Sequence, residues 1–117
     1  MSIRRDYFKA KVDILAQAAA TLLGLKGRGA VLEDAVKLEE AFRQAFGFDG
    51  RLALALPFEE FLKMACRDVK PSPELLAALA KHFSDWADVL EASGKADVAA
   101  LARERAVSCR ALSEPLK

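Results

Sequence analysis

Hydrophobic residues recur every three or four positions along most of this chain, which is the spacing of residues on one face of an α-helix. The first such stretch predicts a helix over about 3–23, and the second predicts a helix over about 30–46. Gly24 and Gly47 follow these stretches, at the position where helices commonly end. The N-terminal part of the chain therefore favours two long amphipathic helices joined by a short connection.

The clearest helix start lies in the C-terminal part. Ser72 is a good N-cap and Pro73 suits the first helical position, so a helix is predicted from there to about Ala92. Gly94 then makes a turn, and a last helix is predicted over about 96–112. The apolar positions on the inner faces are Leu76, Leu79, Phe83, Trp86 and Leu90 in the first helix and Ala99, Ala102, Ala106 and Cys109 in the second.

The segment 51–69 is ambiguous because leucines alternate with alanines over 52–56, as in a strand. A lone strand would have no pairing partner elsewhere in the chain, so a short helical turn is favoured. Pro57 then suits the start of a short amphipathic helix. The chain is therefore predicted to form one all-α domain over 1–117, an antiparallel bundle of about five helices.

Composition and charge narrow the classes of function. The formal net charge is +1, with both signs interspersed, so no long-range field steers the chain to nucleic acid or to an anionic membrane. Arg103, Arg105 and Arg110 form a small basic group without interleaved aromatic residues, which is not typical of a nucleic-acid site. No stretch approaches the ~20 apolar residues of a membrane helix. A cytoplasmic protein with two reduced, apolar cysteines, Cys66 and Cys109, is expected.

Catalytic chemistry has little support in the sequence. His82 is the single histidine, and it precedes Asp85 by three positions, so the two can share a helix face. No further His or Cys stands at metal-ligand spacing, and no catalytic signature is present. A partly exposed or capped histidine is the favoured interpretation, with no enzyme activity and no cofactor. Catalysis by His82 and Asp85 is the least favoured hypothesis.

The segment 80–113 resembles one tetratricopeptide unit, within a hairpin expected over about 74–113. Large apolar residues alternate with small ones on the first helix of that pattern, a glycine makes the turn, and small residues on the second helix admit the first. Gly94, Ala99 and Ala106 match the turn and the small positions, whereas Arg103 stands where the pattern has a large apolar residue. The first-helix matches are Phe83, Trp86, Ala87 and Leu90.

The whole layout is also similar to an uncharacterised family of small bacterial helical proteins, a domain of unknown function. The similarity rests on Asp6-Tyr7 at the start of a long helix, on Ile14-Leu15, and on the segment 54–62 before a tetratricopeptide-like hairpin. This resemblance implies a fold and no known activity.

The leading functional hypothesis is a helical protein-interaction or scaffolding module. Large apolar residues concentrate in the middle of the chain, and leftover apolar surface commonly marks interfaces. The predicted partner surface comprises Phe46, Phe48, Leu54, Phe58 and Phe61. A homodimer that buries this region, or the outer face of the last hairpin, is expected. The alternative is that this segment folds inward and uses its phenylalanines as core.

A second hypothesis is a small-molecule or anion sensor with a pocket between helices. Lys26 and Arg28 flank the start of the second predicted helix, whose free N–H groups favour an anion. These two residues are therefore a candidate anion site.

Overall fold

The computed structural model describes residues 3–22, 28–67 and 69–113, with side chains from Tyr7 in the first range and from Glu33 in the second. All regular structure in these ranges is helical, so the predicted all-α fold is confirmed. The segment 51–69 contains two short helices instead of a strand. The described part has six helices: α1 (Ile3–Ala20), α2 (Arg28–Phe46), α3 (Gly50–Ala55), α4 (Phe58–Cys66), α5 (Pro73–Ala92) and α6 (Ala96–Ser113).

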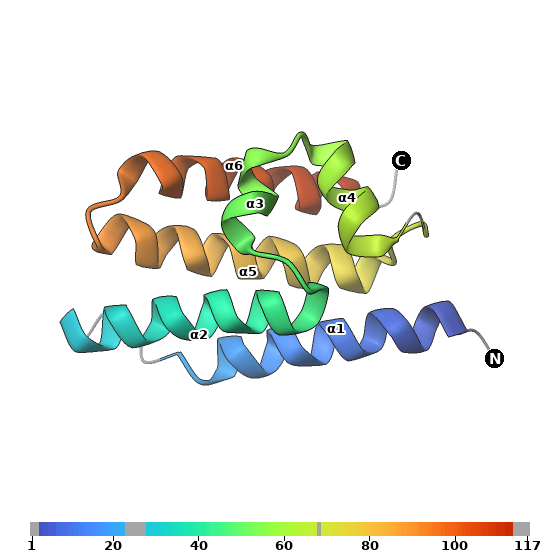
Figure 1. Ribbon diagram of the computed structural model, residues 1–117, viewed down its shortest axis with the longest axis horizontal. Helices are drawn as coiled ribbons and strands as arrows, with labels where there is room; N and C mark the ends of the chain where they lie inside the picture. The colour runs from blue at the N-terminus through green and yellow to red at the C-terminus, as the bar shows by residue number, and fades with distance from the viewer. Residues whose placement is uncertain (1–2, 23–27, 68, 114–117) are drawn as a thin grey trace.

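The four long helices pack side by side, and α5 is the central one (Figure 1). Helix α5 packs against α1 and α2 on one side and against α6 on the other, while α3 and α4 lie across the α2–α5–α6 face. Successive long helices run antiparallel, as the sequence predicted. Helices α1 and α5, which are not successive, run parallel to each other.

The central position of α5 explains its composition. The helix starts where the sequence predicted, because the Ser72 hydroxyl accepts a hydrogen bond from the Leu75 N–H at 3.1 Å and Pro73 occupies the first turn. The predicted stripe is buried, but so are residues on its other sides. The buried residues of α5 are Leu75, Leu76, Leu79, Ala80, His82, Phe83, Trp86, Ala87, Val89 and Leu90. A helix contacted by three others needs apolar residues around most of its circumference.

Helices α5 and α6 form a close hairpin, as predicted. Its turn uses Gly94 at φ +83°, a left-handed conformation in which glycine carries no steric penalty. The whole predicted inner stripe of α6, including Ala99 and Ala106, is buried. Arg103, which departs from the tetratricopeptide pattern, stays at the surface and bridges the two helices. Its guanidinium contacts the carboxylates of Asp88 at 2.9 Å and Glu91 at 2.7 Å.

Candidate functional site

The predicted partner surface mostly belongs to the core. Phe61 and Leu54 are only 0% and 8% exposed, while Phe46, Phe48 and Phe58 are half-buried and pack against the core. The Phe42 ring of α2 packs against several of these rings. Its centroid lies 4.9 Å from that of Phe46, 5.4 Å from that of Phe48 and 6.3 Å from that of Phe61. The middle segment thus packs inward, which was the alternative to an exposed aromatic surface.

The side chains of the candidate anion site, Lys26 and Arg28, lie outside the part of the chain that the structure describes. Helix α2 begins at Arg28. This site stays a prediction of the sequence.

His82 is buried, so the expectation of a partly exposed or capped histidine is wrong. Its side chain is 3% exposed, and its ring centroid lies 5.7 Å from Phe42 and 5.8 Å from Phe83. Asp85 does not join it, because that carboxylate lies 3.2 Å from Lys81 Nζ in an i,i+4 ion pair. In the part of the chain that the structure describes, His82 Nδ1 has no hydrogen-bond partner. Burial lowers the pKa of His82 to about 4, which keeps the imidazole neutral at pH 7.

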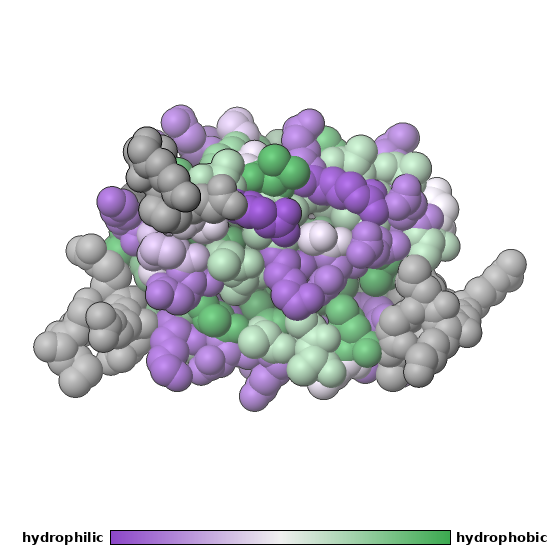
Figure 2. All heavy atoms as spheres, turned by 180° about the vertical axis from the view of Figure 1, so that it is seen from behind, coloured by the Kyte–Doolittle hydropathy of each residue, from purple (hydrophilic) through white to green (hydrophobic). Residues whose placement is uncertain are grey.

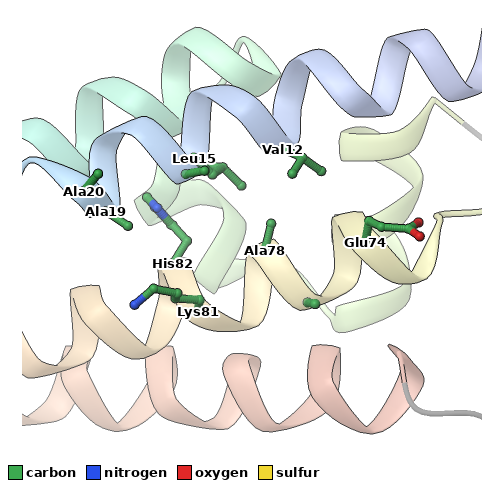
Figure 3. Close-up of a pocket in the computed structure, with 10 residues that line it drawn as sticks. Val12, Leu15, Ala19, Ala20, Glu74, Ala78, Lys81 and His82 are labelled. Carbon is green, nitrogen blue, oxygen red and sulfur yellow. The ribbon is translucent and has the colours of Figure 1, made fainter.

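His82 lies at the bottom of a groove between α1 and α5. Figure 3 shows its ring pointing from α5 toward α1, near Leu15 and Ala19. The groove has a volume of about 590 Å³, and its walls are almost entirely apolar. On the face opposite to that of Figure 1, green side chains gather along the lower half of the molecule (Figure 2). The lining residues are Val12, Leu15, Ala16, Ala19 and Ala20 of α1 and Glu74, Ala77, Ala78, Lys81 and His82 of α5.

A second groove lies between α6 and the corner where α3 meets α4. Its volume is about 340 Å³, and it is lined by residues 54–58 and by Leu101, Glu104, Arg105 and Ser108 of α6. Arg105 Nη2 donates a hydrogen bond to the Leu56 carbonyl oxygen at 2.6 Å. Its guanidinium carbon lies 5.7 Å from the Phe58 ring centroid and 5.2 Å from that of Phe61. This groove contains two residues of the predicted partner surface, Leu54 and Phe58.

Arg105 keeps unused hydrogen-bonding capacity in this groove. Its Nη1 atom is buried and, within the described residues, has no hydrogen-bond partner. None of the ion pairs among those residues involves Arg105. Burial lowers the pKa of its guanidinium, because desolvation disfavours the charged form. A partly buried cation of this kind gains most from a carboxylate or phosphate placed beside it.

The two cysteines pack as small buried residues, as expected. Cys66 and Cys109 are free and buried, and burial raises the pKa of their thiols to about 11 and about 12. Thiols with such values remain protonated and are poor nucleophiles and metal ligands. Among the described residues, no three His, Cys, Asp or Glu side chains are grouped to hold a metal ion. No helix in the described ranges has the length and hydropathy needed to cross a membrane.

The described residues form an all-helical domain with a C-terminal hairpin, and its surface clefts include the two grooves above. No family model, curated protein or solved structure matches this chain. Arg105 and His82 stand out in the sequence, but the sequence alone places neither of them in a groove. The feature of the sequence that could have indicated a site at Arg105 is its position close to the buried stripe of α6. The signal for His82 was its place one position before Phe83, on a helix whose buried face is wider than one stripe.

Proposed function

We propose that this domain is a non-catalytic protein-interaction module that docks a carboxylate-bearing segment of a partner protein beside Arg105. The observation that carries the proposal is that Arg105 lines the groove between α6 and the α3–α4 corner while its buried Nη1 has no hydrogen-bond partner within the described residues. A carboxylate is the natural partner for it, because charge-assisted bonds to guanidinium are stronger than neutral hydrogen bonds.

The surroundings of Arg105 support a peptide partner. Leu101 is 48% exposed and lines the same groove, and the half-buried Phe58 forms another part of the lining. The Phe58 and Phe61 rings beneath the guanidinium, with the Leu56 carbonyl, hold Arg105 in place before anything binds. A fixed arginine beside exposed apolar surface is the composition common at interaction hot spots. The groove therefore suits an acidic side chain, or a chain terminus, flanked by an apolar residue.

Affinity capture from the native host tests this proposal. Tagged wild-type protein is compared with Arg105→Gln and Leu101→Asp, which remove the cation and the apolar rim. Arg110→Gln is the matched control, since Arg110 is exposed on the same helix outside the groove. We expect a set of proteins that wild type and Arg110→Gln retain and that both groove variants lose. Identical capture by all four folded proteins would refute the assignment.

A second copy of the chain is one possible partner. Leu112 and Val107, at 52% and 62% exposure, extend the apolar surface of α6 beyond the groove. We propose that any homodimer forms through this outer face of the hairpin, because the Phe46–Phe61 region is largely used by the core. Sedimentation equilibrium of wild type and Leu101→Asp tests this, and a clean monomer at tens of micromolar would exclude it.

A further inference from the structure

The groove between α1 and α5 is separate from the Arg105 groove and has different chemistry. Its lining spans residues 12–20 of α1 and 74–82 of α5, eight residue steps on each helix. At 1.5 Å per residue both walls are about 12 Å long. Helices α1 and α5 lie side by side along this length (Figure 3). Alanine supplies much of the lining on both sides, so the helices leave a channel instead of filling it.

Among the described residues that line the groove, the charged ones belong to α5. Glu74 stands near one end of the groove, and Lys81 stands at the other end beside His82. Lys81 is already paired with Asp85. The groove lining that α1 contributes is entirely apolar. The middle of the groove thus offers contact to a narrow hydrocarbon and no charge partner for an ionic group.

His82 is the polar feature that this lining does not explain. A buried polar atom without a hydrogen bond costs free energy, and most such atoms in proteins are paired. An apolar residue at this position would pack equally well against Phe42 and Phe83, so packing alone does not require a histidine. A neutral imidazole offers one donor and one acceptor, so it pairs well with a hydroxyl group.

We infer that the α1–α5 groove binds an uncharged, linear apolar molecule that carries one hydroxyl group, with the hydroxyl hydrogen-bonded to the imidazole of His82. The alkyl chain lies along the alanine-lined walls of the two helices. The site discriminates against anionic amphiphiles, because a carboxylate entering it loses its hydration and, among the described lining residues, meets a single cation, Lys81, which is already paired with Asp85. This inference does not rest on the proposed protein partner of Arg105.

Primary alcohols of increasing length are suitable probes. Binding of 1-hexanol, 1-octanol and octanoate is measured by titration while the ¹⁵N signals of the His82 imidazole are recorded. A fully buried methylene strengthens binding about fourfold, so we expect 1-octanol to bind about tenfold more tightly than 1-hexanol in a groove open on one side. We expect octanoate to bind at least about tenfold more weakly than 1-octanol. Saturating 1-octanol should move the imidazole nitrogen signals.

Three variants locate the site. Ala16→Leu fills the groove from α1 and should abolish binding, whereas Ala100→Leu, exposed on α6 outside the groove, should bind like wild type. His82→Phe removes the hydrogen bond and should weaken 1-octanol about fivefold. The imidazole signals of the wild-type protein test the same contact if that variant fails to fold. Absence of saturable binding, full binding by Ala16→Leu, unmoved imidazole signals or equal binding of octanoate would each overturn the inference.

Discussion

We expect acid to destabilise this protein through His82. The ring is buried against Phe42, and the charged groups along its groove are Glu74 and Lys81, the latter paired with Asp85. Its pKa is lowered from 6.5 to about 4 in the folded state, by burial. Between these values the unfolded chain binds the proton and the folded protein does not. Stability is therefore intact above pH 6.5 and falls as the pH drops toward 4.

The size of the effect follows from the two pKa values. One pKa unit corresponds to about 1.4 kcal/mol, so lowering the pH from 7 to 5 removes about 2 kcal/mol of unfolding free energy through this group. Natural domains have only about 5–15 kcal/mol in total, so a loss of this size is readily measured. The wild-type curve sums over every group that binds protons differently in the two states, so it does not by itself isolate His82.

Urea unfolding at pH 7 and pH 5 is the assay, followed by circular dichroism and by the fluorescence of Trp86. His82→Phe serves as the reference, because it retains an aromatic ring and removes the titrating group while the carboxylates stay. We expect wild type to lose about 2 kcal/mol more than His82→Phe between the two pH values. Equal losses in the two proteins would refute the reasoning, since His82 would then titrate alike in the folded and unfolded states.

Three further predictions concern the core. In Gly50→Ala the new Cβ would lie 3.2 and 3.3 Å from two atoms of the buried Trp86 ring. We expect the free energy of unfolding in urea to fall by about 1–3 kcal/mol, and an unchanged value would contradict this packing. Ala106→Leu should overpack the α5–α6 hairpin and lower the free energy of unfolding by a similar amount, as measured by calorimetry. Ala100→Leu, at an exposed position, should change the free energy of unfolding by no more than about 0.5 kcal/mol. Equal melting temperatures of the two variants would contradict a close crossing of the helices at Ala106. Cys109, whose thiol pKa is raised to about 12 by burial, should react with a disulfide reagent at pH 8 only after unfolding, and rapid labelling of the folded protein would disprove its burial.

Much of the fold was readable from local sequence. The N-cap and proline at residues 72 and 73 predicted the start of α5, and the small residues of α6 predicted the buried side of the hairpin. Helical periodicity identifies one buried stripe, which is sufficient for α6 because α6 packs mainly on one neighbour. It is insufficient for α5, whose three neighbours bury additional sides. His82 lies on one of those sides, so its burial was missed.

The candidate sites were harder to predict because they depend on contacts between distant segments. Arg105 meets the Leu56 carbonyl across 49 positions of sequence, and no local pattern couples the two. The aromatic residues of the middle segment were predicted as a possible surface because their number seemed large for a small core. Phe42 gathers several of them against α5, so the core is larger than the pattern of any single helix indicated.

The parallel pairing of α1 with α5 has a consequence for the order of folding. Helices α5 and α6 meet across a turn of residues 93–95, whereas residues 21–72 separate α1 from α5 in the sequence. Closing a long loop costs more entropy than closing a short one, so we expect the hairpin to form early and α1 to dock late. The same asymmetry places α1 among the segments that open most readily in the native state, with faster amide hydrogen exchange than α5. A molecule held between α1 and α5 binds only when α1 is docked, so it would slow exchange along α1 and stabilise the last step of folding.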